Sequence, residues 1–267
     1  MTELYILKLG GSVCTDKQNN RFKVNEQIVR LVAREIKSAR KKKKFRLIVV
    51  NGAGPFGHTN VHEYGINNGV RFPKDFEGMC RTAIDCADLN LQIAKLFWKE
   101  GLLAYPVPAS AITVQKNKKI VHQDTAVISE LFRQNEQLIP VLNGTFVADN
   151  KIGGSVVSGD ATIAHLAKKL HAKKVLFGTD VNGVYTRDPK KFSDAKQIHL
   201  ISKKNWKTVL LGVGESAALD VSGGMKGKLG RLAEKTRGIP IVIFDATKKG
   251  NTFDALSGKK IGTLVGL

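Results

Sequence analysis

The sequence predicts an α/β fold in which a mainly parallel β-sheet is covered by helices on both faces. Segments with strand character alternate along the chain with segments of helical spacing, and this alternation is typical of parallel sheets with helical crossovers. Several strand segments, such as "LIVV" at 47–50, are apolar throughout, as expected for strands that are buried on both sides. A chain of 267 residues is long enough for one such unit with two lobes.

The chain opens with a predicted strand at 4–9, which runs into a Gly-Gly turn. A helix is predicted over 25–43, because asparagine is a favoured N-cap residue and apolar residues then recur at every third or fourth position. A second strand is predicted at 45–50. The apolar face of the helix consists of Ile28, Leu31, Val32 and Ile36.

A long helix is expected next, and it should end at Gly101, since glycine is common just after a helix C-terminus. Its predicted buried face consists of Ile84, Ala87, Leu91, Ala94 and Trp98. The elements predicted after it are a strand at 102–108, a hairpin at 112–122 with its turn at Lys116–Lys119, a helix from Asp124 to about Gln134, and strand residues at 138–149 split by Asn143-Gly144.

The second half begins after a predicted helix at 158–170, for which Ser158 is a possible N-cap. The elements expected there are a strand from 174, a loop over 186–202, a helix at 225–235, a strand at 239–246 and a closing edge strand at 261–266. We expect the boundary between two lobes of one continuous fold near Leu170, which divides residues 1–170 from residues 171–267.

The composition narrows the choice of partners. The net charge is +20, which is compatible with nucleic-acid binding. However, no aromatic residues alternate with the basic ones in a stacking pattern, and an anionic small substrate accounts for the charge equally well. We therefore expect a small-molecule substrate, with neither a nucleic-acid partner nor a membrane span. The cysteines Cys14, Cys80 and Cys86 show no metal-ligand spacing and are expected to be reduced thiols in the cytoplasm.

Ligands of parallel sheets bind where strands end and helices begin, so the turns after the predicted strands are the candidate sites. In "KLGGS", Lys8 precedes Gly10-Gly11, and adjacent glycines let backbone N–H groups approach a phosphate closely. The spacing is not that of a Walker A loop. Taken alone, this segment is equally a tight turn with a lysine that extends into solvent.

The second turn is "NGAGPFGHTN" at 51–60. Its glycines give a flexible backbone, and His58 is expected to begin a helix whose N-terminus would favour an anion. A lone histidine is also commonly structural. In the third turn, Gly159-Asp160 open a helix, where the aspartate is either a capping residue or a group that orients lysines from neighbouring turns.

Further turns, "GTDVNGVY" and "GGMKGK", again place glycines beside aspartate or lysine. Repeated glycine turns with lysines close by suggest a site for polyanionic phosphate. The predicted reaction is phosphoryl transfer, in which positioning and charge neutralisation supply nearly all the catalysis.

Four segments in order, "KLGGS", "GDATIAHLAKKL", "TDVNGVYTRDP" and "GGMKGK", resemble the amino acid kinase superfamily over nearly the whole chain. Within it, "LGGSVCTDK" and "GAGPFGH" are most similar to the isopentenyl phosphate kinases. The resemblance implies an open αβα sandwich that forms homodimers, with an acceptor-binding lobe at 1–170 and a nucleotide-binding lobe at 171–267. It also implies ATP-dependent phosphorylation of isopentenyl phosphate, with Mg²⁺ carried mainly by the nucleotide phosphates and no metal site of the protein's own.

The resemblance implies roles for individual residues. Lys17 would neutralise the transferring phosphoryl group, Asp160 would orient the lysines, and His58 would hydrogen-bond the acceptor's phosphate. The implied nucleotide-binding residues are Lys8, Gly10, Gly11, Ser12, Asp180, Gly183, Tyr185, Gly224 and Lys228. The implied acceptor-binding residues are Gly52, Ala53, Gly54, Gly57, His58 and Gly159, and the implied catalytic residues are Lys8, Lys17, His58, Asp160 and Lys228.

The chain departs from the family pattern in the second turn, where "NGAGP" replaces the usual HGGGS. Ala53 adds a Cβ atom and Pro55 removes an N–H donor. Asn182 stands where an aspartate is usual, which lowers the negative charge near the nucleotide. Two alternatives therefore stay open: a kinase of another small phosphate or phosphonate, as in fosfomycin-type kinases, and a non-catalytic basic protein that binds nucleic acid or acts as a sensor.

Overall fold

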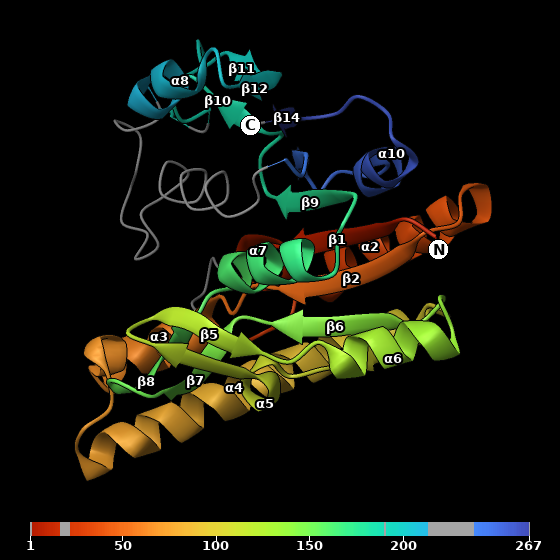
Figure 1. Cartoon of the computed structure of the whole chain (residues 1–267). Coiled ribbons are helices and arrows are strands. Elements are labelled where there is room, and N and C mark those ends of the chain that lie inside the picture. Colours follow the sequence, from red (N-terminus) through yellow and green to blue (C-terminus); the bar gives the residue numbers. More distant parts are fainter. Residues whose placement is uncertain (1, 17–21, 190, 213–237, 267) are drawn as a thin grey trace.

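The centre of the molecule is an eight-stranded sheet in the order β12-β14-β13-β9-β1-β2-β6-β3 (Figure 1). The computed structural model describes residues 2–16, 22–189, 191–212 and 238–266. The strands of this sheet are β1 (Leu4–Leu9), β2 (Arg46–Asn51), β3 (Ala104–Pro106), β6 (Ile139–Asn143), β9 (Lys174–Thr179), β12 (Leu200–Ser202), β13 (Ile241–Asp245) and β14 (Thr263–Gly266). The predicted α/β class is confirmed.

All neighbouring strands of this sheet run parallel except β13 and β14, which are antiparallel. β1 lies between β2 and β9, so both halves of the chain share one sheet. The prediction of an edge strand at the end of the chain is wrong. β14 is covered on its outer side by β12, which comes from the segment 186–202 that was expected to be a loop. The same segment contributes β11 (Gln197–Ile198), which pairs with β10 (Val184–Tyr185).

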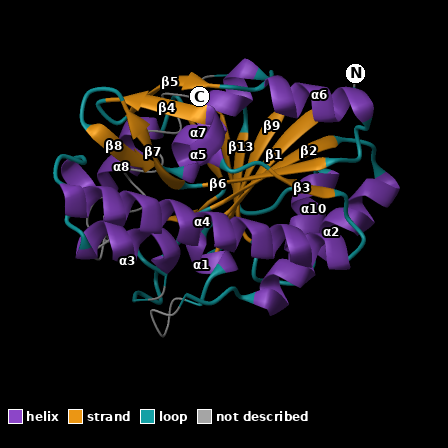
Figure 2. Cartoon of the chain, turned by 90° about the horizontal axis from the view of Figure 1, so that it is seen from below, coloured by secondary structure: helices purple, strands orange, loops and turns teal. Residues whose placement is uncertain are grey.

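Helices cover both faces of the sheet (Figure 2). α2 (Glu26–Lys42), α4 (Pro73–Lys99) and α10 (Asn251–Ser257) pack on one face, and α6 (Ala126–Gln134), α7 (Gly159–Lys169) and α8 (Trp206–Gly212) pack on the other. The shorter helical elements are α1 (Gly11–Cys14), α3 (Pro55–Glu63), η1 (Ile66–Asn68) and α5 (Ala109–Ile112). The predicted helix at 225–235 lies outside the described residues.

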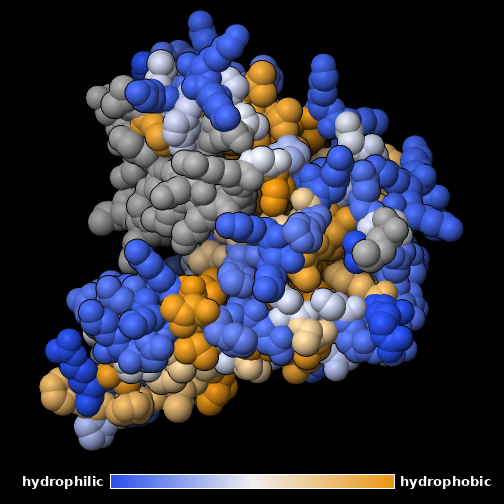
Figure 3. All heavy atoms as spheres, in the orientation of Figure 1, coloured by the Kyte–Doolittle hydropathy of each residue, from blue (hydrophilic) through white to orange (hydrophobic). Residues whose placement is uncertain are grey.

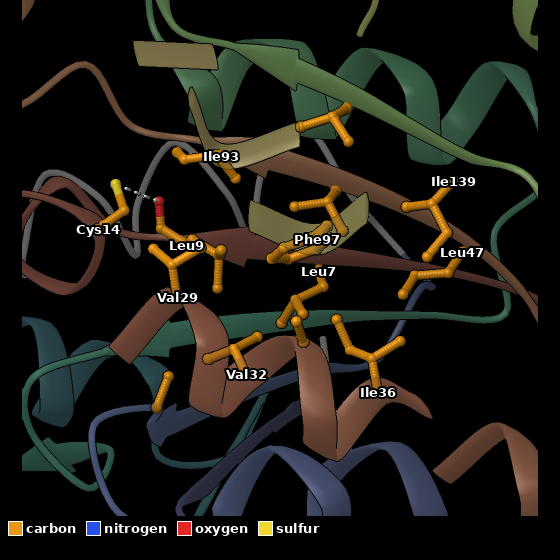
Figure 4. Packing of buried hydrophobic residues seen from close by; sticks show 14 of the residues in the cluster. Leu7, Leu9, Cys14, Val29, Val32, Ile36, Leu47, Ile93, Phe97 and Ile139 are labelled. Atoms are coloured by element: carbon orange, nitrogen blue, oxygen red, sulfur yellow. Dashed lines mark hydrogen bonds between the residues drawn. The ribbon is translucent and has the colours of Figure 1, made fainter. Parts of the chain in front are cut away.

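Alternate residues of β1 supply the two halves of the core. Leu7 and Leu9 face α2 and α4, whereas Leu4 and Ile6 face α7 (Figure 4 shows the first half). Burial of one leucine or isoleucine side chain contributes about 1.5–3 kcal/mol to the stability of the fold. Because β1 buries such side chains on both faces, packing stabilises the strand from both sides. This two-sided burial fixes the place where β1 ends, and therefore the position of the glycine turn that follows it.

α2 forms where it was predicted. The Asn25 side chain accepts a hydrogen bond from the Ile28 N–H at 3.3 Å, which confirms the N-cap. The buried face is turned slightly from the expected one, because Val29 is fully buried whereas Ile28 is half-buried.

Of the predicted buried face of the long helix α4, Ala94 is buried as predicted and Ala87 is half-buried, but the prediction is wrong for the three large residues. Ile84, Leu91 and Trp98 are exposed, with 67% of Trp98 accessible to solvent. Residues one or two positions away, such as Leu89 and Ile93, pack into the core instead. The helix carries apolar residues around most of its circumference, so spacing alone did not identify the face that meets the sheet.

A second, four-stranded sheet in the order β5-β4-β7-β8 stands beside the main one. Its strands are β4 (Thr113–Lys116), β5 (Lys119–Gln123), β7 (Thr145–Asp149) and β8 (Gly153–Val157), so the predicted hairpin is confirmed. α6 follows it as predicted. Thr125 occupies the N-cap position, and the Asp124 carboxylate accepts a hydrogen bond from the Ala126 N–H of the first turn at 2.8 Å. In the part of the chain that the structure describes, no helix is long and apolar enough to span a membrane.

Candidate active site

A cavity of about 410 Å³ opens where β1, β2, β6 and β9 end. This is the edge of a parallel sheet at which ligands bind in open α/β folds. The predicted site residues that line the cavity are Lys8, Gly10, Gly11, Ser12, Gly52, Ala53, Gly54, Gly57, His58, Gly159, Asp160 and Asp180. Segments far apart in the sequence therefore meet at this one cavity.

Lys8 and Asp160 form a buried ion pair on one wall of the cavity. Lys8 lies near the end of β1, and Asp160 is in the first turn of α7. Only 11% of the lysine side chain is exposed, and its ammonium lies 5.0 Å from the centre of the Phe177 ring. A buried ammonium needs a partner, and Asp160 supplies it here. The N-cap of α7 is Ser158, whose side chain accepts a hydrogen bond from the Ala161 N–H.

The glycine turns after β1 and β2 pack backbone against backbone. A Cβ atom on Gly11 would lie 2.9 Å from the Gly54 Cα atom, and one on Gly52 would lie 2.7 Å from the Gly11 nitrogen. Gly54 also has a φ of 53°, a conformation that side chains other than glycine rarely adopt. These positions require glycine because any side chain would push the two turns apart.

Two helix N-termini point into the cavity. α3 begins directly after Gly54, and α7 begins at Gly159. Backbone N–H groups at helix N-termini favour anions. The helix was expected to begin at His58, but it begins at Pro55, because proline suits the first helical position, where its missing N–H would have no partner anyway. His58 therefore lies in the first turn of α3, with an exposed side chain that lines the cavity.

A second group of contacts links the turn after β1 to the end of β9. The Ser12 hydroxyl donates to Asp180 at 3.1 Å, and the Gly10 N–H donates to the Gly178 carbonyl at 3.0 Å. Asp180 and Thr179 line the cavity here. This side of the site joins the first strand to the second half of the chain.

The wall formed by α3, α4 and β8 is largely apolar. Its lining residues include Val61 of α3, Thr82 of α4 and Val156 of β8. Beneath it lies Cys86, whose sulfur would be 3.2 Å from a Cβ atom on Gly57. Burial raises the pKa of the Cys86 thiol to about 12, so this thiol stays neutral. The cavity thus combines a polar, donor-rich end with an apolar wall.

Not every predicted site residue lines this cavity. Gly183 and Tyr185 lie elsewhere: Gly183, with a φ of 106°, packs against Thr263 of β14. Lys17, Gly224 and Lys228 fall outside the described residues. In the part of the chain that the structure covers, no group of three or more histidine, cysteine, aspartate or glutamate side chains could hold a metal ion.

Sequence reasoning missed several lining residues, among them Gly144, Thr145 and Thr179. Each lies at or just after the end of a strand of the main sheet. A predicted strand that ends in glycine and threonine could have identified these residues, because the other turns were identified from the same kind of pattern. The apolar lining residues carry no such signal, since valine and isoleucine are equally common in the core.

Comparison with known proteins gives three related findings. Residues 3–245 match the model of the amino acid kinase family. The chain is 34% identical to the isopentenyl phosphate kinase of Methanothermobacter thermautotrophicus and 33% identical to that of Methanocaldococcus jannaschii, with 97% of each chain covered in both cases. An X-ray structure of an isopentenyl phosphate kinase superposes with a TM-score of 0.81 at 32% identity, covering 98% of this chain and 99% of that one.

Proposed function

The chain belongs to the amino acid kinase family, and we propose that it catalyses the ATP-dependent phosphorylation of isopentenyl phosphate. An oxygen of the acceptor's phosphate attacks the γ-phosphorus of ATP, the bond to the β-phosphate oxygen breaks, and isopentenyl diphosphate and ADP are formed. The observation that carries the proposal is the cavity, in which anion-binding turns stand next to an apolar wall. A phosphate with a short hydrocarbon tail matches both parts. The two similar kinases carry the same activity in their names.

The nucleotide's phosphates are assigned to the side of the cavity formed by Lys8, the glycine pair after β1, and Ser12. In phosphoryl transfer, charge builds up on the equatorial and bridging oxygens, and fixed cations and donors stabilise it. The Lys8–Asp160 pair supports this role, because it holds the ammonium in place before the substrates arrive. Lys17, Lys228 and Gly224 are proposed to complete this side, together with Asp180, Gly183 and Tyr185.

The acceptor's phosphate is assigned to the turn after β2 and the first turn of α3. Gly52 and Gly54 would offer backbone N–H groups to this phosphate. Gly57 allows α3 to pack closely on Cys86 of α4. Gly159 lines the same cavity at the start of α7. His58 is proposed to donate a hydrogen bond to this phosphate. Ala53 lines the cavity as well, and its Cβ atom lies so close to Gly57 that a Cβ atom there would be only 2.6 Å away.

ATP is proposed as the phosphoryl donor, with Mg²⁺ carried by its phosphates. Bound Mg²⁺ usually keeps several waters and contacts nucleotide phosphates more than protein side chains. When bound, the ion would neutralise charge on the β- and γ-phosphates. The residues that face this region are Lys8, Ser12 and Asp180.

We also propose the lobe assignment of acceptor binding to 1–170 and nucleotide binding to 171–267, a cytoplasmic location and a homodimer. The cytoplasm is supported by the three cysteines, all of them described, which form no disulfide. The homodimer is supported by the exposed row Ile84, Leu91 and Trp98 on α4. Figure 3 shows apolar side chains along the lower edge of the molecule, over α4.

The decisive experiment measures ADP release with a panel of acceptors. Isopentenyl phosphate is expected to support ATP turnover far better than glutamate, aspartate, carbamate or UMP. Fosfomycin and other small phosphates test the alternative acceptors on the same scaffold. Comparable or better turnover with any of these compounds would contradict the proposal. Binding of DNA or RNA that weakens with salt, in the absence of any turnover, would favour a non-catalytic protein.

A further inference from the structure

Three asparagine side chains are completely buried behind the acceptor side of the cavity. Asn51 and Asn143 are the last residues of β2 and β6, and Asn90 lies in the middle of α4. All three have an exposed fraction of 0%. Asparagine is mostly an exposed residue, so three of them at one place in a core require an explanation.

Asn90 connects α4 to the ends of two strands. Its amide nitrogen donates to the Asn51 side-chain oxygen at 3.0 Å and to the Val141 carbonyl at 3.1 Å. Asn51 in turn donates to the carbonyl of Gly52 at 3.3 Å. Gly52 is the first residue of the turn assigned to the acceptor's phosphate, so this chain of bonds reaches the site directly.

Asn143 extends the network to the neighbouring turn. Asn51 and Asn143 are partners in the parallel register of β2 and β6. Asn143 donates to the Cys86 carbonyl of α4 at 3.1 Å and accepts from the Ala109 N–H at 3.0 Å. The Gly144 N–H donates to the Asn51 carbonyl at 2.9 Å. The turns after β2 and β6 are therefore tied to the same stretch of α4.

The network is incomplete in one respect: the side-chain oxygen of Asn90 is buried and has no hydrogen-bond partner in the described part of the chain. A buried polar atom without a partner lowers stability. Leucine, which has the same branched shape as asparagine, would remove this cost if it replaced both Asn51 and Asn90, because neither amide would then be left without its partner. Stability alone therefore does not account for the amide, and sites where a chain gives up stability are commonly functional.

We propose that Asn51 and Asn90 are positioning residues, which hold the turn Gly52–Gly54 and the first turn of α3 at the place where the acceptor's phosphate binds. The inference rests on the proposed function for the identity of the acceptor. It goes beyond that function in assigning a role to side chains that do not line the cavity.

The test compares Asn51→Leu, Asn90→Leu and the double variant. Each single change leaves the other amide without its partner, so both are expected to lower the melting temperature. The double variant removes both polar groups and should regain much of that loss. In all three, kcat/KM for the acceptor should fall by about 10- to 100-fold, because small displacements of binding groups have effects of this size. The KM for ATP should stay near the wild-type value.

The chain offers a closely matched control pair in the second sheet. Gln123 donates to the Thr113 hydroxyl at 2.8 Å, is buried, and also has a side-chain oxygen without a partner among the described residues. Neither residue lines the cavity. The double variant Gln123→Leu/Thr113→Val is expected to change the melting temperature but not kcat/KM for the acceptor. If the double variant Asn51→Leu/Asn90→Leu does not fold, Asn90→Ala is compared with Gln123→Ala instead.

Hydrogen exchange of the protein without substrates gives a readout that does not depend on activity. Backbone amides of residues 51–58 should exchange faster in the Asn51 and Asn90 variants than in the wild type or the control. Recovery of both melting temperature and kcat/KM in the double variant, or unchanged kcat/KM in every variant, would overturn the proposal. If the wild type prefers another phosphate acceptor, the proposed function fails. The ratio of kcat/KM between each variant and the wild type, measured with that other acceptor, still tests the role of the asparagines.

Discussion

Single side chains at this site are held in place by partners from distant parts of the chain. Lys8 and Asp160 are 152 residues apart in sequence, yet they form the buried ion pair on one wall of the cavity. Sequence patterns could indicate that both residues follow or precede a turn, but they could not show that the two side chains meet. His58 illustrates the same limit, since its place in the first turn of α3 depends on Pro55 and Gly54 before it.

The role of His58 can be tested by three substitutions. His58→Ala is expected to lower kcat/KM for isopentenyl phosphate by about 10²–10³-fold, the usual cost of one donor at a developing charge, while the KM for ATP changes little. His58→Asn and His58→Gln keep a donor and should retain more activity than alanine. The measurements are steady-state rates with each substrate varied in turn.

A different outcome would identify His58 as a general base. In that case the asparagine and glutamine variants would be as inactive as alanine, and the wild-type rate would rise with pH through a single ionisation near the usual histidine value of about 6.5. Full activity in all three variants would make His58 structural.

At the scale of the elements, one aspartate fixes two hairpin turns of the second sheet. Asp149 accepts hydrogen bonds from the N–H groups of Asn117 and Lys118 in the β4–β5 turn, and from Lys151 in the β7–β8 turn. The Ser155 hydroxyl also donates to it, at 2.7 Å. Asn117 and Lys118 have positive φ values of 50° and 64°, a backbone state that needs such support. β8, which carries Val156 of the apolar wall, is positioned through this residue.

Replacement of this aspartate should weaken the protein in a pH-dependent way. Burial on its own would raise the pKa of Asp149, but the donors from Lys118, Ser155, Lys151 and Asn117 outweigh it and hold the pKa well below its usual range. The folded state therefore gains stability from the ionised carboxylate at neutral pH. That gain is fully present above the unfolded value of about 3.9, decreases as the pH falls below it, and is lost only when the pH falls through the lower pKa of the folded state.

We expect Asp149→Asn to lower the free energy of unfolding at pH 7 by about 1–3 kcal/mol. The difference from the wild type should shrink progressively when urea unfolding is repeated below pH 4, because the wild type then loses an increasing part of the same stabilisation. Asp88→Asn, at an exposed position of α4, serves as the control. A difference that stays constant from pH 7 to pH 3 would argue against the carboxylate as its source.

Most helices and strands could be predicted from the sequence. The incorrect predictions, for the buried face of α4 and for β12, have physical reasons. Strands such as β2 are short apolar runs between turn residues, so local sequence defines them. The buried face of α4 was not predictable, because whether Ile84 or Leu89 meets the sheet depends on the tertiary contacts of the helix. β12 was missed for a similar reason: its three residues form a strand only because β14 lies beside them.

At the scale of the whole molecule, one side of α4 presents large apolar side chains that are exposed in the described chain. Ile84, Leu91 and Trp98 are spaced seven residues apart and therefore lie along one side of the helix. Tyr105, on the neighbouring edge strand β3, is also exposed. Apolar groups gathered in this way commonly mark an interface.

We expect the wild type to elute as a dimer in size-exclusion chromatography with light scattering, and Leu91→Glu/Trp98→Glu to shift it to a monomer, since buried charges without partners oppose association. Val127→Glu, at an exposed apolar position of α6, is the matched control and should leave the dimer intact. A monomeric wild type at micromolar concentration would contradict the homodimer.

The place of β1 between β2 and β9 has a consequence for the order in which the protein can form during synthesis. One side of β1 can pair as soon as β2 emerges from the ribosome, but the other waits for residues 174–178. At translation rates of roughly 5–20 residues per second, that interval lasts on the order of ten seconds. During this time one edge of β1, a strand that is fully buried in the finished protein, is unpaired. Lys8 also has no Asp160 beside it until α7 is made. The nascent chain is therefore open to capture by chaperones or to aggregation until its second half arrives, and the catalytic cavity is among the last parts of the molecule to be completed.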